Sequence, residues 1–407
     1  MKTPKLRILP VVLLAWGVAW AGTRSGTACR AGLELKLDAA AGVHGGVERG
    51  TSLHGLALAH VSWDPGDDAA GWRGFASMLG LGGRGPTGKY LGDFLAASNT
   101  EGFESVRLYA WWVERNAGAW SLRAGALLAD EEFTGTESGG HLINSSFGWP
   151  AFISANTVNT GPAFYVAAPG IRLHWAKNES LAWRVGVYDG DTFDSPTGDP
   201  AVNRHGWRYG LGGEQGWFVI GEADIAFGAE RFSRLKLGAW LHTADFADVY
   251  RDADGQPFDA TGNPPRQHTG NVGAYAVFER HLAGAPGEPG SIDAHVRAGV
   301  APRDRNALGW VLDTGVAWRG PLPGRPGDVV AIGFTHANFS ADLAAASRLA
   351  SPGSAALDHE EVCELTYVFA VHEGLSLQPD LQWAIHPGGS ATLPDSLLLT
   401  LRINASF

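Results

Sequence analysis

Four arginines lie where side chains on neighbouring extended segments could face one water-filled space. Arg107, Arg123, Arg172 and Arg184 belong to four consecutive segments in which polar residues alternate with apolar ones. Guanidinium groups carry several N–H donors in a fixed fork, which suits carboxylates and the vicinal hydroxyls of polyols. If the four segments are neighbouring strands, the arginines form a basic wall along one interior. The alternative is that they pair structurally with loop carboxylates.

Carboxylates that could face this wall lie in two long segments without regular alternation. They are Asp93 and Glu101 in the first segment, and Asp130, Glu131, Glu132 and Glu137 in the second. Two more acids, Glu222 and Asp224, occupy the polar face of a later segment. Opposite charges across a narrow gap orient water and polyols and select weakly by ionic charge, so this arrangement suits neutral sugars.

Aromatic side chains divide into two groups by position. Trp120, Trp175, Trp183 and Trp383 fall on apolar faces near segment ends, as expected of girdle residues at a membrane interface. The candidates for stacking on sugar rings are Phe133, Phe147 and Trp149 in the second long segment, with Tyr109 and Trp111 on a polar face. For Trp149, packing of the loop against a wall is the alternative role.

The elements that would position these residues are strands. At the C-terminus, Leu397, Leu399, Leu401, Ile403 and Phe407 share one face, while polar residues such as Thr400 and Arg402 share the other. The same alternation recurs along the chain and predicts about sixteen strands of near ten residues. They are Leu33 to Gly42, Ser52 to Trp63, Trp72 to Gly80, Ser105 to Arg115, Ala119 to Leu128, Gly170 to Lys177, Leu181 to Tyr188, Trp217 to Phe227, Ser233 to Thr243, Gly270 to Arg280, Ser291 to Val300, Leu308 to Trp318, Gly327 to Asn338, Asp358 to Ala370, Gly374 to Ile385 and Ser396 to Phe407.

The predicted connections alternate in length. Connections after odd strands are mostly long: Leu81 to Glu104, Ala129 to Pro169, Asp189 to Gly216, Ala244 to Thr269 and Phe339 to Leu357. Those after even strands include tight turns such as Asn116 to Gly118 and Asn178 to Ser180. This asymmetry predicts an all-β fold: a transmembrane, antiparallel, up-and-down β-barrel with folded extracellular loops that constrict the lumen. The short gap from Ala301 to Ala307 does not follow the rule, nor do the long stretches His281 to Gly290 and Arg319 to Pro326.

The N-terminus reads as an export signal. Three basic residues precede an apolar run from Ile8 to Ala19, and Ala19-Trp20-Ala21 offers a cleavage site, so we expect a signal peptide over 1–21, a short extension over 22–31 and the barrel over 32–407. Cleavage would take the formal charge from −11 to −14, because three bases and no acids are removed. Such an acidic chain, without a Lys/Arg block, argues against nucleic acid as a partner.

Composition and cysteine usage narrow the class further. Charged residues make up 18% of the 407, hydrophobic residues 45%, and there are 56 Gly and 16 Trp, an unusual mixture for a cytosolic enzyme. The state of Cys29 and Cys363, the two cysteines, stays open, since one bridge would not make a framework. The oxygen-rich stretch Asp252 to Gly255 approaches calcium-loop spacing, but Pro257 breaks the pattern, so we expect no metal and no cofactor.

Several blocks resemble the carbohydrate-selective porins of the OprB type. They are Gly139 to Pro150 within the long loop, Tyr90 to Glu101, Arg107 to Glu114, Glu364 to Tyr367 with Leu375 to Gln382, and His386 to Gly389. The resemblance implies a pore constricted by the loops Leu81 to Glu104 and Ala129 to Pro169. It carries these positions into the constriction: Asp93, Asn99, Glu101, Arg107, Glu132, Asn144, Ser145, Phe147 and Trp149. Glu114 also matches, although alternation puts it on the apolar side of its strand unless a bulge intervenes.

The leading hypothesis is a bacterial outer-membrane porin for passive diffusion of mono- or small oligosaccharides, without catalysis. Its partners would be sugars, outer-membrane lipid and lipopolysaccharide, the barrel-assembly machinery through the strand ending in Phe407, and further copies in a homo-oligomer. A general, non-selective porin is one alternative. An exported glycosidase is another, because paired acids such as Glu131 and Glu132 suit that chemistry, although neighbours on an extended chain point apart.

Overall fold

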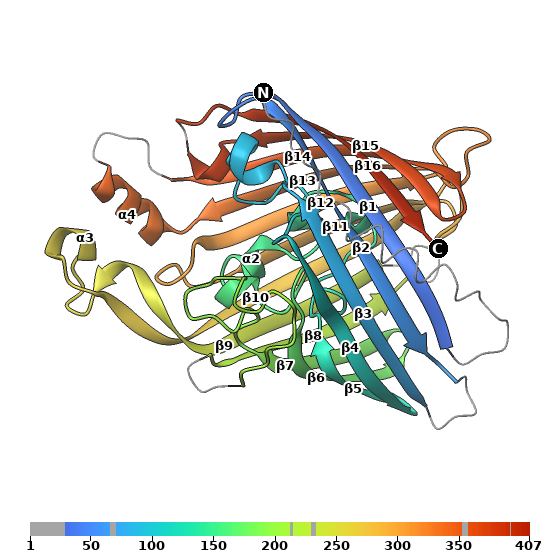
Figure 1. The fold of residues 1–407 in the computed structure, drawn as a ribbon, viewed down its shortest axis with the longest axis horizontal. Helices are drawn as coiled ribbons and strands as arrows, with labels where there is room; N and C mark the ends of the chain where they lie inside the picture. The colour runs from blue at the N-terminus through green and yellow to red at the C-terminus, as the bar shows by residue number, and fades with distance from the viewer. Residues whose placement is uncertain (1–28, 66–70, 212–214, 229–232, 352–356, 391) are drawn as a thin grey trace.

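Sixteen antiparallel strands close into one barrel, in which each strand pairs with its neighbours in sequence and β1 pairs with β16. The computed structural model describes residues 29–65, 71–211, 215–228, 233–351, 357–390 and 392–407 (Figure 1). The expected signal peptide lies outside these residues. The predicted fold class and the strand number are confirmed.

Strand bounds follow the alternation closely in most places. The strands are β1 (Cys29–His44), β2 (Gly50–Trp63), β3 (Trp72–Gly83), β4 (Ser105–Ala117), β5 (Trp120–Leu127), β6 (Ala168–Asn178), β7 (Leu181–Asp189), β8 (Trp217–Phe227), β9 (Ser233–Asp252), β10 (Pro265–Ala283), β11 (Ile292–Val300), β12 (Leu308–Arg319), β13 (Val329–Phe339), β14 (His359–His372), β15 (Leu375–Ile385) and β16 (Ser396–Ser406). Because β1 begins at Cys29, three residues of the predicted extension belong to the barrel.

Two predicted loops contain regular structure. The stretch from Ala244 to Thr269 is mostly strand, because β9 and β10 continue to pair with each other beyond their neighbours, as far as Asp252 and Pro265. Only a short tip with helix α3 (Phe258–Thr261) remains. The stretch from Phe339 to Leu357 contains helix α4 (Ala341–Ala350), whose first turn is capped by the Ser340 hydroxyl accepting from Leu343 N.

The two ends of the barrel differ. We call the end that carries the connections after odd strands the loop end, and the opposite end the turn end. Figure 1 shows α3 and α4 together at the loop end, and the C-terminus on the other side. At the turn end, β4 and β5 are joined through Gly118, whose φ of 58° is a conformation that glycine adopts readily. None of the helices in the described residues is long and apolar enough to span a membrane.

The outward face of the barrel is an apolar belt edged by aromatic rings. Leu399 and Leu401 of β16 are 47% and 46% exposed, whereas Leu398 between Leu397 and Leu399 is buried. Trp120 packs on Trp183 and Trp175 near the turn end, with ring centroids 5.5 and 6.2 Å apart. Large outward aromatic residues near the turn end are Trp63, Trp72, Trp120, Phe227 and Trp318, and those near the loop end are Trp217, Trp310 and Trp383. This is the pattern of a barrel in a membrane.

Candidate functional site

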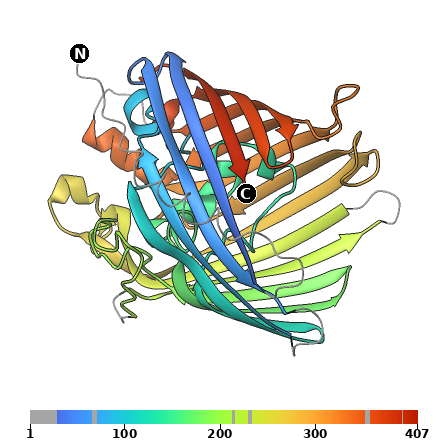
Figure 2. The ribbon, with the colours of Figure 1, turned by 45° about the vertical axis from the view of Figure 1, so that its right-hand side comes forward.

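The loop between β5 and β6, residues 128–167, folds into the lumen instead of away from it, and we call it L3. Figure 2 shows its segments, with helix α2 (Ala151–Ser154), inside the ring of strands. Short turns of 3-10 helix at Gly139–His141, Ser145–Phe147 and Val158–Thr160 make it compact. Ile143, Phe152 and Ile153 are fully buried, so L3 has a core shared with the barrel wall.

Wall side chains hold L3 by its backbone. Glu222 of β8 accepts from Thr134 N at 2.8 Å, and Glu364 of β14 accepts from Ile143 N and Asn144 N. Arg297 of β11, fully buried, donates to the carbonyls of Thr134, Ser146 and Gly148 at 2.7 to 3.0 Å while its Nε bonds Asp313.

Charged wall groups therefore satisfy backbone groups that burial would otherwise leave without partners. L3 is fixed against β8 to β14 at several points along its length.

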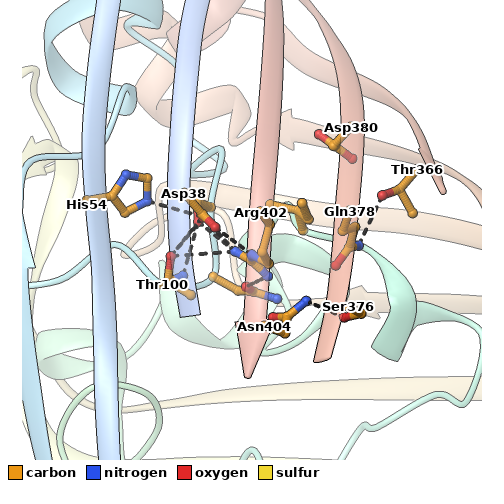
Figure 3. Close-up of polar contacts among 12 residues, drawn as sticks. Asp38, His54, Thr100, Thr366, Ser376, Gln378, Asp380, Arg402 and Asn404 are labelled. Atoms are coloured by element: carbon orange, nitrogen blue, oxygen red, sulfur yellow. Dashed lines mark hydrogen bonds and ion pairs between the residues drawn. The ribbon is translucent and has the colours of Figure 1, made fainter. Parts of the chain in front are cut away.

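The loop between β3 and β4, residues 84–104, continues this inner layer, and we call it L2. Asn99 N donates to Ile143 O at 2.8 Å, and Ser145 N donates to Ala96 O at 3.0 Å, so L2 and L3 pair directly. Across the seam of the barrel, Arg402 of β16 makes two bonds of 2.7 Å to Asp38 of β1, which also accepts from Thr100 of L2. Figure 3 shows Arg402, Asp38 and Thr100 pointing toward one another. Together, L2 and L3 line the wall from β8 round to β1.

Opposite this layer, two arginines and two glutamates form a compact charged cluster. Arg123 of β5 lies 2.9 Å from both Glu114 and Glu132, and Arg172 of β6 lies 2.6 Å from Glu114 and 2.5 Å from Glu132. We call these four residues the charge cluster. Glu132 belongs to L3, so the cluster also joins the loop to the wall. The Arg123 side chain is 18% exposed and that of Glu132 15%, which leaves both reachable from the lumen.

Glu114 reaches this cluster because of a β-bulge. Ala76 pairs with Trp111 and Met78 with Leu108, so Tyr109 and Ala110 of β4 stand opposite Ser77 alone. The Ser77 hydroxyl bonds both the N–H and the carbonyl of Ala110, at 3.1 and 2.9 Å.

The extra residue reverses the alternation beyond it. Glu114 therefore faces the lumen, and the prediction that Trp111 lies on the polar face is wrong: Trp111 is 37% exposed on the outer face, where its Nε1 donates to the Tyr209 hydroxyl.

Arg107 does not join the predicted basic wall. It is 1% exposed and donates to the carbonyls of Asn203, Arg204 and Tyr165, so it ties the loop between β7 and β8 to the barrel. Tyr109 is also buried, at 7%. Arg184 does face the lumen, where it contacts Asp224 at 3.5 Å and the Glu132 carbonyl. Arg123 and Arg172 therefore share the charge cluster, whereas Arg107 and Arg184 serve other local structures.

The aromatic residues predicted to stack on sugar are buried in this structure. Phe133, Phe147 and Trp149 are 0%, 1% and 9% exposed, and the Trp149 Nε1 donates to Thr160 O. Phe147 packs against Leu142 and the wall residues Val329 and Ala331. These rings hold L3 against the wall, and the expectation that they offer a face to sugar is not met here.

The amide and hydroxyl positions carried over from the resemblance meet at the contact of L2 with L3. Asn144 is fully buried, where it caps a turn by accepting from Ser146 N and donates to Gln382. Asn99 accepts from Arg402 at 2.8 Å. Asn99 and Ser145 are half-buried, so of this group they are the two that solute can reach.

Asp93 and Glu101 form a separate acidic group within L2. Burial raises the pKa of Asp93 to about 7 and that of Glu101 to about 8. Glu101 accepts a 2.8 Å bond from the Thr87 hydroxyl, which lowers its pKa by less than burial raises it. Both carboxyls therefore hold their protons well above the usual range.

The raised pKa values predict that L2 docks less firmly as the pH rises. A carboxyl whose folded pKa exceeds its unfolded pKa stabilises the fold most at low pH, and this contribution is lost between about pH 4.5 and pH 8. Glu101→Gln imitates the protonated acid and should match the wild type at pH 5. At pH 9 the variant should be more stable in denaturant unfolding, by roughly 1.4 kcal/mol or more. Glu179→Gln, at an exposed turn, is the control. Equal stability of Glu101→Gln and wild type at both pH values would contradict the burial of this acid.

Sequence reasoning missed the residues that anchor the loops. Arg297, Glu364, Gln382, Arg402 and Asp38 are all buried and all lie on lumen-facing positions of their strands. Charged or amide side chains at lumen-facing positions can be recognised in the sequence. The groups that they bind cannot be recognised, because partners such as Arg297 and Ser146 are 151 residues apart.

The structure bears on two questions that the sequence left open: a calcium site at Asp252, and the state of the two cysteines. Asp252 accepts from Thr261, Asn263 and two backbone N–H groups, so its carboxylate organises a turn. Within the part of the chain that the structure covers, no cluster of three or more His, Cys, Asp or Glu side chains could hold a metal ion. No disulfide joins Cys29 to Cys363 in the described part.

Comparisons with known proteins agree with this geometry. The model of the carbohydrate-selective porin family, OprB, matches residues 68–407. Porin B of Pseudomonas aeruginosa is 24% identical over 292 residues, which cover 68% of this chain. The chain spans 59% of the length of that relative.

Solved structures share the fold. The high-pH structure of Pseudomonas putida OprB superposes with a TM-score of 0.84 at 19% identity, covering 93% of this chain and 94% of that one. Salmonella typhi OmpF in complex with daunomycin gives a TM-score of 0.52 at 10% identity, covering 93% and 97%. At such identities the likeness concerns the barrel and its strand order.

Proposed function

This chain belongs to the OprB family of carbohydrate-selective porins, and we propose that it is a passive channel that prefers neutral sugars. The family and the closed barrel place it in the bacterial outer membrane, so the loop end faces the exterior and the turn end the periplasm. The solutes would be mono- or small oligosaccharides.

The charge cluster is the observation that carries this proposal. Its two guanidinium groups and two carboxylates neutralise one another at 2.5 to 2.9 Å. Because the charges of the two guanidinium groups and the two carboxylates cancel, the cluster offers hydrogen-bond donors and acceptors to sugar hydroxyls but attracts ions only weakly. Arg123 is also held in plane by stacking on Trp112, 3.9 Å from the ring centre. A rigid, neutral, polar edge suits a polyol that must bind weakly and leave again.

Other site residues fit this proposal in a supporting role. Glu132 and Arg172 belong to the charge cluster itself, whereas Asn99, Ser145 and Arg184 are half-buried elsewhere along the lumen. Asp93, Asn144, Phe147, Trp149 and Arg107 would act through the position of the loops.

The glycosidase alternative finds less support. Both carboxylate oxygens of Glu132 are engaged by arginines, one by Arg123 and one by Arg172, so this side chain is not free to reach a glycosidic oxygen. Burial raises the pKa of neighbouring Glu131 to about 7, but the two side chains belong to adjacent residues, and the fold is that of a channel. A general porin remains the competing function that experiments must separate from sugar selectivity.

Further partners follow from the surfaces. The outward belt would contact outer-membrane lipid and lipopolysaccharide, and would also be the surface through which a homo-oligomer forms. The C-terminal Phe407 is 78% exposed and bonded to Leu33 through its backbone, which leaves its side chain for the barrel-assembly machinery.

Arg123→Met tests the role of the cluster. The variant removes one fork and leaves Glu114 and Glu132 with a single arginine, so the lumen gains negative charge. We expect block of the ionic current by glucose to weaken at least threefold and cation preference to rise, measured in planar bilayers. Arg303→Met, whose side chain is 68% exposed outside the lumen, should change neither. An unchanged glucose block in Arg123→Met would show that the cluster does not touch sugar.

A further inference from the structure

A pocket of about 280 Å³ lies between L3 and the wall and borders the charge cluster at Glu132. Its wall side includes Arg184 of β7, Lys236 of β9, Glu279 of β10 and Asp293 of β11. Each of these lies within four residues of the turn end of its strand. L3 residues 131–132 and 135–138 form its other side. The pocket therefore opens on the periplasmic side of the constriction.

Most of the charged side chains around this pocket are paired. Lys236 lies 3.0 Å from Glu279, His281 lies 2.7 Å from Asp293, and Arg184 lies 3.5 Å from Asp224. A pocket with paired charges of both signs has little net attraction for an anion or a cation. It still presents many hydrogen-bonding groups at its surface, which is the environment a neutral polyol requires.

Two polar atoms of the lining are left without hydrogen-bond partners. They are the hydroxyl of Thr136, a residue only 9% exposed, and the Nε of Arg184. Buried donors and acceptors of this kind favour a ligand with hydroxyl groups, because an unmade bond costs free energy.

The size of the pocket limits the ligand. Drug-sized ligands occupy pockets of roughly 300 to 1,000 Å³, so a volume of about 280 Å³ suits one sugar ring and excludes an extended oligosaccharide. We propose that this pocket is a second sugar subsite, which takes a single neutral monosaccharide on the periplasmic side of the constriction. The inference rests on the proposed function, since it adds a second sugar-binding site to the same channel. Two weak sites in series allow solute to enter and leave without tight binding at either.

Gly135 supplies a direct test. It lines the pocket, and a Cβ added to it would meet no atom within 4 Å, so a larger side chain can be introduced without a clash at the backbone. Gly135→Phe should fill part of the pocket. Gly140→Phe is the matched control, because Gly140 lies on the same loop, also has open space beside it and does not line the pocket.

The measurement is single-channel current with glucose added to one side at a time. In the wild type, glucose on the periplasmic side should produce two kinetic classes of block. Gly135→Phe should lose one class and raise the half-blocking concentration from that side at least threefold, while block from the outer side stays within twofold. Gly140→Phe should keep both classes. Thr136→Val, which removes only the hydroxyl, should weaken the same class in part, and a sugar acid of equal size should block no better than glucose.

The outcomes separate the two proposals. If glucose blocks the wild type but Gly135→Phe behaves like Gly140→Phe and Thr136→Val like the wild type, the subsite is wrong and the proposed function stands. If the sugar acid blocks much better than glucose, the pocket binds anions instead. If glucose blocks the wild type from neither side, the proposed function fails and the subsite fails with it.

Discussion

Replacing Arg297 with methionine should at least double the single-channel conductance and abolish block by glucose. Arg297 bonds three carbonyls of L3 and the carboxylate of Asp313, and it is fully buried. Methionine keeps much of the volume but leaves three carbonyls without their donor and Asp313 without its arginine, with His295 as its other partner. Breaking a buried ion pair in this way costs about 3–5 kcal/mol. That cost falls on the docking of L3, so the loop should leave the wall and widen the passage.

Two variants control this experiment. Arg297→Lys keeps the charge but lacks the planar fork, so it should give an intermediate conductance. Arg303→Met removes an exposed arginine and should behave as the wild type. Wild-type conductance and wild-type glucose block in Arg297→Met would mean that L3 is held by other contacts.

Gly299→Val should also displace L3, in this case by adding a steric clash instead of removing a contact. A Cβ at Gly299 of β11 would lie 2.3 Å from the Cγ of Phe152, whose ring is fully buried on the lumen side. The ring also packs on Tyr275 at 5.7 Å between centroids, so it has little room to retreat. Overpacking of this kind costs about 1–3 kcal/mol. We expect a lower unfolding free energy in denaturant titrations and an unstable, noisy conductance.

The control for this variant uses another strand glycine. A Cβ at Gly82 of β3 would meet nothing within 4 Å, so Gly82→Val should leave both stability and conductance close to wild type. If the two variants behaved alike, the packing of Phe152 on a glycine of the wall would not be what holds L3.

The barrel itself could be predicted from the sequence because its signal is local. A strand that separates lipid from water must alternate along its own length, as residues 397–406 do. The extension of β9 and β10 could not be predicted in the same way. Beyond Ala244 the two strands pair with each other outside the main ring, where they no longer separate lipid from the lumen and alternation is not required.

In β4, the assignment of alternate residues to the lumen and to the lipid failed because of a β-bulge. The bulge at Tyr109 and Ala110 inserts one residue, so every later side chain of β4 changes face. Alternation assigned Trp111 to the lumen and Glu114 to the lipid, and both assignments reverse. The match of Glu114 to the resembling family was the hint that the alternation breaks there.

The constriction was predicted in outline: Figure 2 shows L3 inside the ring of strands, and L2 pairs with L3 through its backbone. Their anchors depend on contacts between residues far apart in sequence, such as Glu364 with Asn144, 220 residues apart, and alternation cannot supply these pairs. It also cannot tell an arginine that faces solute from one that is satisfied by carbonyls. Alternation assigns both Arg123 and Arg107 to the lumen. In the structure, however, the Arg123 side chain is 18% exposed, whereas Arg107 is only 1% exposed.

Liposome swelling with the purified protein distinguishes a sugar-selective channel from a general porin. Vesicles containing the channel would be challenged with glucose, with a non-sugar solute of equal size and with a sugar acid, at matched osmolarity. A sugar-selective channel should admit glucose severalfold faster than either control, and Arg123→Met should narrow this difference. Equal rates for glucose and the non-sugar solute would contradict sugar selectivity and leave a general porin.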